Sequence, residues 1–210
     1  MILNCVYIDS VDERFLSPPW TYTAGFLAAD VLADYTGQTE YDLPHSFVRR
    51  ALAVNDECFA IRDGDRLAAY GWYSSNENHF SDELTLRFSG EWVYMYRGFT
   101  HPAYRGQRLH AIGMTMALAA YQARGFKGLV SCVEARNTAS LRSVYRMGYQ
   151  RFGKIYGIRL GRLLGKRHSR SRLLNHQIIY STPGCKQFRF SLEPTTGFDA
   201  SSSVPQPLKV

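Results

Sequence analysis

A short basic turn with the sequence RGQRLH occupies residues 105–110, between an aromatic apolar run and a long helical pattern. We expect a helix over residues 105–123. The first turn of a helix has unpaired N–H groups and the positive end of the helix dipole, so it can bind an anion. Arg105 and Arg108 add two guanidinium groups, and with the N–H groups of residues 106–110 they could hold a pyrophosphate. On this turn alone, a helix start with two solvated arginines is the simpler interpretation.

Two motifs at and beyond this turn resemble those of the GNAT superfamily of acyl-CoA-dependent N-acyltransferases. The first is THPAYRG at residues 100–106, which is similar to the family's approach to its phosphate motif, R/Q-x-x-G-x-G/A. The second is NTASL at residues 137–141 followed by YRMGY at 145–149, which is similar to a family segment running from Asn to Tyr and ending in Gly-Phe or Gly-Tyr. The order and spacing of the two motifs both fit, and the resemblance covers about residues 55–157.

The resemblance implies roles for particular residues. In this family the central strand splays from its neighbour, so backbone groups at Gly98, Phe99 and Thr100 would pair with the pantetheine arm of coenzyme A. Asn137 would contact the pantetheine or phosphate end, and Tyr145 would lie near the sulfur as the general acid that protonates the leaving thiolate. The cofactor-binding residues implied in this way are Gly98, Phe99, Thr100, Arg105, Gly106, Gln107, Arg108, Leu109, His110 and Asn137.

The chain departs from the family pattern at the turn. Family members usually have Gly where this chain has Arg108, and Gly or Ala where it has His110. We expect both residues to keep ordinary helical dihedrals, because helix N–H donors do not require glycine at each position. A side chain is then tolerated at both positions, and Arg108 adds charge.

No obvious general base stands near the turn. Family members often place a Glu on the central strand, but residues 95–97 of this chain are Met-Tyr-Arg. Glu91 and Glu134 lie near strand ends and could act through water, although an ordinary surface or capping acid is the simpler interpretation of each. Arg97 could hold a substrate carboxylate, and a salt bridge to a neighbour is its more ordinary explanation. The N–H near Phe99 could stabilise an oxyanion.

The remaining pattern predicts the elements that position this turn. Helical spacing favours amphipathic helices over residues 24–35 and 43–54. Hairpins are expected around Asp63-Gly64 and around Ser89-Gly90, and Gly98 indicates a bulge or a close backbone approach.

From residue 92 the order is strand, helix, strand, helix, strand, and its first half indicates a right-handed crossover between parallel strands. Trp92, Tyr94 and Tyr96 should share one face, as core or as the lining of a substrate pocket. We therefore expect an α/β (α+β) fold in which helices flank a mixed central sheet. The resemblance adds that its central strands are splayed.

Charge divides the chain unevenly. Residues 1–134 hold 11 Lys/Arg and 16 Asp/Glu, a net of −5, whereas residues 135–210 hold 14 Lys/Arg and 2 Asp/Glu, a net of +12. We expect an acyltransferase domain over residues 1–160, a basic extension over 161–193 that packs on or completes the sheet, and a flexible tail over 194–210.

The family resemblance implies an N-acetyltransferase that uses acetyl-CoA or a related acyl-CoA and an amine on a small molecule or peptide. Three alternatives stay open: transfer from an acyl carrier protein, whose acidic surface would suit the basic portion, an acyl-CoA-binding protein without catalysis, and a basic nucleic-acid-binding module. Nucleic acid is disfavoured because aromatic residues are not interleaved with the basic run. The acceptor, the acyl chain length and the oligomeric state are left open, with a dimer allowed.

The four cysteines, Cys5, Cys58, Cys132 and Cys185, are far apart and form no C-x-x-C pair, so we expect reduced thiols and no metal site. No apolar run approaches the ~20 residues of a membrane helix. The N-terminal residues lack a basic segment followed by a long apolar run, so we expect no secretory signal and a cytoplasmic protein.

Overall fold

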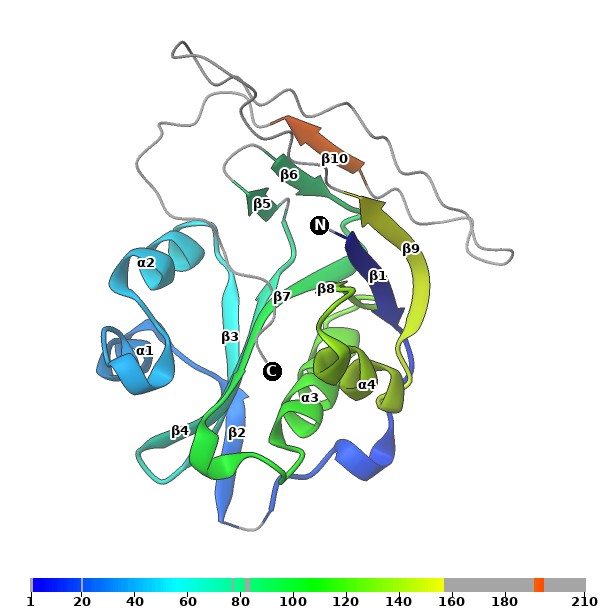
Figure 1. The fold of residues 1–210 in the computed structure, drawn as a ribbon. Helices are drawn as coiled ribbons and strands as arrows, with labels where there is room; N and C mark the ends of the chain where they lie inside the picture. Colours follow the sequence, from blue (N-terminus) through cyan, green and yellow to red (C-terminus); the bar gives the residue numbers. More distant parts are fainter. Residues whose placement is uncertain (1, 20, 77, 82–83, 157–190, 195–210) are drawn as a thin grey trace.

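The computed structural model describes residues 2–19, 21–76, 78–81, 84–156 and 191–194. Its centre is a seven-stranded mixed sheet in the order β2-β3-β4-β7-β8-β1-β9 (Figure 1). The strands of this sheet are β1 (Ile2–Ile8), β2 (Tyr22–Phe26), β3 (Glu57–Asp63), β4 (Arg66–Ser74), β7 (Trp92–Thr100), β8 (Gly128–Glu134) and β9 (Gln150–Tyr156).

Two pairs of helices cover the two faces of this sheet, with α1 and α2 on one face and α3 and α4 on the other (Figure 1). Their bounds are α1 (Ala29–Tyr35), α2 (His45–Ala53), α3 (Leu109–Ala123) and α4 (Thr138–Arg146), and short 3-10 turns lie at Glu13–Phe15, Thr39–Tyr41 and Pro102–Tyr104. This arrangement confirms the expected mixed sheet flanked by helices. Within the described part of the chain, no helix is both long and apolar enough to cross a membrane.

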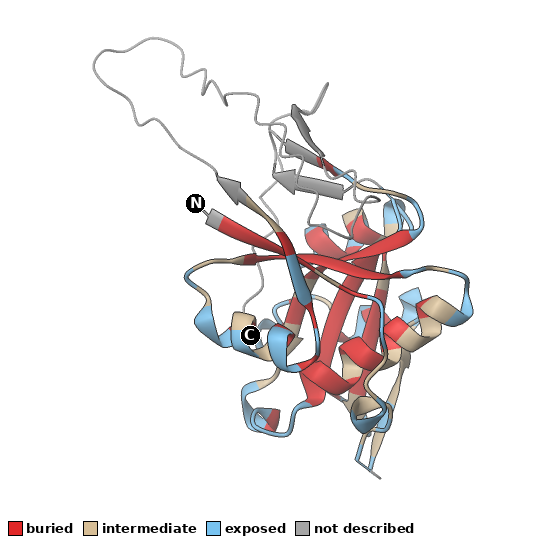
Figure 2. Ribbon diagram, turned by 90° about the vertical axis from the view of Figure 1, so that its right-hand side faces the viewer, coloured by how far each residue is buried: buried red, intermediate tan, exposed pale blue. Residues whose placement is uncertain are grey.

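Strands β7 and β8, joined through α3, run parallel, as the order of elements from residue 92 predicted. The other neighbouring strands of the large sheet pair antiparallel. Side chains of β7 alternate between two apolar clusters, because successive residues of a strand point to opposite faces. Trp92, Tyr94 and Tyr96 pack on the α1/α2 face, whereas Val93 and Met95 pack beneath α3 and α4. The shared face predicted for the three aromatic residues is confirmed, and the strands of the sheet are largely buried (Figure 2).

The parallel pairing between β7 and β8 stops half-way along β7. Its last register pair is Met95 with Ser131, although β7 continues to Thr100 and β8 to Glu134. At this point β7 has a bulge, because Trp72 of β4 pairs with Arg97 and Tyr73 pairs with Met95, which leaves Tyr96 as the extra residue. A bulge bends its strand and ends regular pairing. The splayed central strands are thus present, and the bulge lies at Tyr96 rather than at Gly98.

Two local predictions were wrong because tertiary pairing overrides local pattern. Residues 24–26 form the end of β2 instead of helix, since Ala24 and Phe26 pair with Ile61 and Phe59 of β3, and α1 begins only at Ala29. The hairpin expected around Ser89-Gly90 does not form. Instead a separate three-stranded sheet has the order β10-β6-β5, with β10 (Ser191–Pro194), β6 (Leu84–Arg87) and β5 (Asn78–Ser81).

The sequence reasoning also missed β1, whose backbone lies between β8 and β9 in the sheet. After Tyr156 the structure describes only Ser191–Pro194, which form β10. The basic segment at 161–190 and the tail from 195 lie outside the described residues, so the proposed division of the chain there stays a prediction.

Candidate active site

The basic turn before α3 carries several backbone N–H groups that no backbone acceptor receives among the described residues. The helix begins at Leu109, four residues later than predicted, and residues 105–108 form a turn in which Gly106 has φ 82° and Arg108 has φ 61°. The first backbone bond of the helix runs from Ile112 N to Arg108 O. Among the described residues, no backbone acceptor receives the N–H groups of residues 106–111. Left-handed residues can turn successive N–H groups toward one point, as in an anion-binding nest. Gly106 and Arg108 supply two such residues, and we refer to residues 106–111 as the nest.

Arg108 does not keep helical dihedrals, and our expectation for it was wrong. It is the N-cap of α3 in the left-handed conformation, with no side-chain capping bond. That conformation suits the glycine usual at this position in the family, and it destabilises the fold by about 1–2 kcal/mol when the residue has a Cβ atom. Arg105 and Arg108 are both exposed beside the nest. The Gln107 side chain is held by Tyr22 at the start of β2, because its Oε1 accepts a hydrogen bond from the Tyr22 hydroxyl at 2.8 Å.

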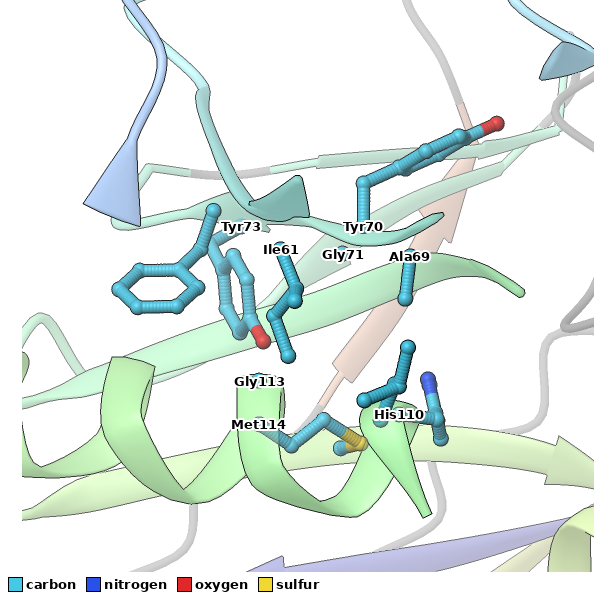
Figure 3. Close-up of a pocket in the computed structure, with 10 residues that line it drawn as sticks. Ile61, Ala69, Tyr70, Gly71, Tyr73, His110, Gly113 and Met114 are labelled. Carbon is cyan, nitrogen blue, oxygen red and sulfur yellow. The ribbon is translucent and has the colours of Figure 1, made fainter. Parts of the chain in front are cut away.

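His110 lies inside α3 with ordinary helical backbone, as expected, but its imidazole does not join the nest. The side chain is buried and lines a small cavity between α3 and strands β3 and β4, with Gly113 and Met114 opposite Ile61 and Tyr73 (Figure 3). Its Nε2 has no hydrogen-bond partner among the described residues. Burial lowers the pKa of His110 to about 4, so the ring is neutral at pH 7. Only the backbone N–H of His110 can serve an anion.

The fork between β7 and β8 opens toward the end of β7 from which the chain runs on to the nest. Ser131 Oγ donates a hydrogen bond of 2.8 Å to the carbonyl oxygen of Met95, the last paired residue of β7. Beyond it, Gly98, Phe99 and Thr100 pair with β4 on one side, whereas β8 offers them no strand partner on the other. The fork therefore presents a strand edge that an extended amide-containing chain can pair with.

Helix α4 follows β8 and bounds the fork. Asn137 is its N-cap, since its Oδ1 accepts a hydrogen bond of 3.0 Å from the N–H of Ser140. Ser140 and Val144 are buried, but Tyr145 is 43% exposed, so its ring is not part of the core. Its predicted role as general acid stays a prediction, as does the predicted contact of Asn137 with the cofactor.

Comparison with known protein families gives one match that covers residues 24–149, to the acetyltransferase (GNAT) family. The chain belongs to the GNAT family. The match includes the nest, the fork and α4, so the resemblance seen in the two motifs is confirmed over a longer stretch of the chain.

One solved structure supports the fold at low identity, and two others are similar over the same share of this chain. A GCN5-related N-acetyltransferase from Sphaerobacter thermophilus matches at a TM-score of 0.50 and 12% identity, over 73% of this chain and 49% of that one. A GCN5-related N-acetyltransferase-like protein from Streptococcus suis matches at 0.49 and 11% identity, over 73% and 59%. A GNAT-family protein from Novosphingobium aromaticivorans matches at 0.46 and 19% identity, over 73% and 60%. The chain thus spans at most three fifths of these three proteins. A search of curated proteins found no match.

Glu91 and Arg97, near and on the central strand β7, each form an ion pair with another side chain. Glu91 Oε2 lies 2.9 Å from Lys127 Nζ, which makes it a surface ion pair. Arg97 lies 3.0 Å from the Asp42 carboxylate and over the Phe47 ring, 4.4 Å from its centroid. The simpler interpretation of both residues is therefore correct. Among the described residues, no group of three or more His, Cys, Asp or Glu side chains is arranged to hold a metal ion.

One polar pair of this GNAT site was missed from the sequence. Asp56, just before β3, is 4% exposed and its Oδ2 accepts a hydrogen bond of 2.8 Å from the hydroxyl of Tyr96, the bulged residue of β7. Burial raises the pKa of Asp56 to about 6, although the Ser74 and Tyr96 hydroxyls act in the opposite direction. Asp56 and Tyr96 are 40 positions apart, and no local pattern joins them, so only the three-dimensional fold reveals the pair.

Proposed function

We propose that this GNAT protein is an N-acyltransferase of the cytoplasm that moves an acyl group, most simply acetyl, from acyl-CoA to an amine by direct attack. The observation that carries the proposal is the pairing of two features at one end of β7. The nest of unpaired N–H groups at residues 106–111 suits a diphosphate, and the strand edge at residues 98–100 suits the amide-containing pantetheine arm.

Acyl-CoA is the acyl donor, and the residues present fit it. Arg105 and Arg108 stand exposed beside the nest, where they would neutralise phosphate charge. His110 contributes its N–H alone, because its neutral imidazole is buried on the other side of the helix start. The edge of β7 at Gly98 and Phe99 would hold the pantetheine amides in line with the fork.

The transfer forms a bond from the amine nitrogen to the acyl carbon and breaks the bond from that carbon to sulfur. A backbone N–H near Phe99 would stabilise the negative oxygen that develops on the acyl carbon. Tyr145, which remains partly exposed on α4, would give its proton to the departing thiolate. The amine must reach the acyl carbon in its neutral form, although a free alkyl ammonium has a pKa near about 10. The neutral amine then loses one N–H proton as its nitrogen bonds to the acyl carbon.

Acetyl-CoA binding and turnover test the proposal separately. Isothermal titration should detect acetyl-CoA and CoA well below millimolar concentration. Release of the CoA thiol should depend on an added amine from a panel of lysine, spermidine, tryptamine, kanamycin and an alanyl peptide. Absence of binding at millimolar acetyl-CoA would end the proposal, and binding without amine-dependent thiol release would leave an acyl-CoA-binding protein without catalysis.

Replacing Tyr145 by Phe removes the predicted acid without changing the ring. We expect turnover to fall on the order of 100-fold, the usual contribution of a general acid, while acetyl-CoA affinity stays within about twofold. Tyr149→Phe is the matched control, because the Tyr149 hydroxyl is buried and has no partner among the described residues. Equal loss of affinity and turnover in Tyr145→Phe would refute the acid role.

A further inference from the structure

A buried carboxyl group bonded to the bulged residue of β7 has no role in the chemistry described so far. Asp56 Oδ2 accepts a hydrogen bond from the Tyr96 hydroxyl at 2.8 Å, whereas no group among the described residues bonds to Oδ1 with good geometry, although the Ser74 hydroxyl is near enough to lower the pKa of the carboxyl group. A buried carboxylate usually has most of its acceptor positions filled. A half-satisfied carboxyl group is therefore a candidate for function rather than for stability.

The backbone brings Tyr96 to the reaction site. It is the residue after Met95, where pairing between β7 and β8 ends, and it is the extra residue of the bulge. The bulge places the side chains of Tyr96 and Arg97 on the same face of β7, because both rest against Phe47 of α2. This is the α1/α2 face, opposite the face on which α3 packs. Tyr96 is 9% exposed, so an amine would have to enter between β7 and α2 to reach its hydroxyl, while the nucleotide stays on the α3 side.

We propose that the Tyr96 hydroxyl contacts the attacking amine as a catalytic residue and that Asp56 is the positioning residue that receives the proton through it. This assignment rests on the proposed N-acyltransferase function and supplies its missing base. Family members often use a strand carboxylate for this task. Here the carboxylate belongs to the residue before β3 and is connected to β7 by a tyrosine.

The proton balance of this step is complete. As the nitrogen bonds to the acyl carbon, one N–H proton moves to the Tyr96 oxygen while the Tyr96 hydroxyl proton moves to Asp56 Oδ2. The carbon–sulfur bond breaks and the thiolate takes a proton from Tyr145. The net products are the amide and the free thiol, with Asp56 protonated and Tyr145 deprotonated until solvent restores both.

The surroundings of Asp56 keep it available as a base. The titratable or charged groups that interact with the pair are Tyr96 itself, Cys58 of β3 and Arg97 of β7, with Ser74 of β4 beside the carboxyl group. Glu57, the next residue, is engaged elsewhere, by Arg124 at 2.9 Å. Burial raises the pKa of Asp56 to about 6, which makes it a stronger base than an exposed carboxylate and still mostly ionised at pH 7. Burial also raises the pKa of Tyr96 well above its usual value, so the hydroxyl acts as a relay and not as a free phenolate.

Asp56→Asn tests the assignment with little change of shape. Asparagine can still accept the Tyr96 hydrogen bond through its amide oxygen, but it cannot take up a proton. We expect turnover with the most active amine of the panel to fall on the order of 100-fold, while the Kd for acetyl-CoA by titration stays within about twofold. Asp65→Asn is the matched control, since Asp65 is exposed in the turn between β3 and β4.

The pH profile separates a proton acceptor from a structural residue. At saturating amine, wild-type turnover should rise with pH along a limb near pH 6, and this limb should disappear in Asp56→Asn. Tyr96→Phe breaks the same relay, so we expect a similar loss of turnover and little additional loss in the double variant.

Wild-type turnover in Asp56→Asn, or an unchanged limb near pH 6, would overturn the assignment while leaving the proposed transferase function intact. A parallel loss of turnover, acetyl-CoA affinity and cooperative unfolding would equally overturn it, because such a loss would show that Asp56 has a structural role. If Asp56→Asn does not fold, Tyr96→Phe decides by the same measurements. No thiol release by the wild-type protein with any amine would instead refute the proposed function on which the assignment rests.

Discussion

The buried imidazole of His110 should make folding stability depend on pH in a direction that can be worked out from its surroundings. Burial lowers its pKa to about 4 from the usual 6.5. Between these values the unfolded chain binds a proton that the folded protein does not, so stability rises as pH rises. The full difference corresponds to about 3 kcal/mol, of which 2 to 3 kcal/mol falls between pH 4.5 and pH 7.5.

Asp56 acts in the opposite direction over nearly the same range. Its pKa is raised by burial to about 6 from 3.8, so here the folded protein binds the proton that the unfolded chain has lost. Stability therefore falls as pH rises through this window, by about 2 kcal/mol between pH 4.5 and pH 7.5. The two buried groups largely cancel in the wild-type protein, and removing either one should reveal the other.

Urea unfolding at half-unit steps from pH 4.5 to pH 7.5 measures this directly. We expect the stability of the wild type minus that of His110→Ala to grow by 2 to 3 kcal/mol with rising pH, because the remaining titrating groups cancel in the difference. The stability of Asp56→Asn minus that of the wild type should likewise grow with pH, by about 2 kcal/mol. A His110→Ala curve parallel to the wild-type curve would show that the imidazole is not buried and neutral, and would refute the reasoning.

Three further substitutions test the geometry of the turn and the fork. Arg108→Gly should be about 1 kcal/mol more stable than Arg108→Ala in urea, since only glycine adopts the left-handed conformation without strain. Both variants should bind acetyl-CoA about tenfold less tightly than wild type because a guanidinium group is lost. Equal stability of the two variants would show that Arg108 is not strained. Gly128→Ala should lower the unfolding free energy by about 2 kcal/mol or more, because its Cβ would collide with the Ile8 carbonyl oxygen, and a thermal melt like that of wild type would refute the clash. Ser131→Ala should cost about 1 kcal/mol through loss of its bond to the Met95 carbonyl, and an unchanged midpoint in urea would show that water replaces the bond.

Much of the fold could be predicted because its signals are local. The crossover from β7 through α3 to β8 follows from two apolar runs around a helical pattern, and the alternation of Trp92, Tyr94 and Tyr96 follows from the period of a strand. The turn that we propose to bind the diphosphate could likewise be located, because its glycine, its two arginines and the start of the helix are adjacent in sequence. These features depend on neighbours within a few residues.

The features that were missed depend on partners far away in sequence. The backbone of Ile2–Ile8 becomes an inner strand only because β8 and β9 lie on either side of it. Residues 22–26 are drawn into the sheet by β3, against a helical spacing. The left-handed Arg108 was missed for a different reason, since residue type argues against that conformation and only the geometry of the turn imposes it.

Strand β7 lacks the Glu that family members often carry there, and we assign its role as base to a carboxyl group from another part of the chain. A family pattern transferred residue by residue would miss such a base. A base is needed at a point in space, and the side chain that supplies it need not come from the strand that passes nearest. The bulge turns Tyr96 toward the α1/α2 face, where its hydroxyl reaches the Asp56 carboxyl group across β4. Because a hydroxyl group both donates and accepts, it can extend the reach of a carboxylate by the length of a tyrosine ring. Strand β7 itself carries no acid, and Glu91, the residue before it, is held in a surface ion pair, whereas the buried carboxyl group of Asp56 is connected to β7 through Tyr96.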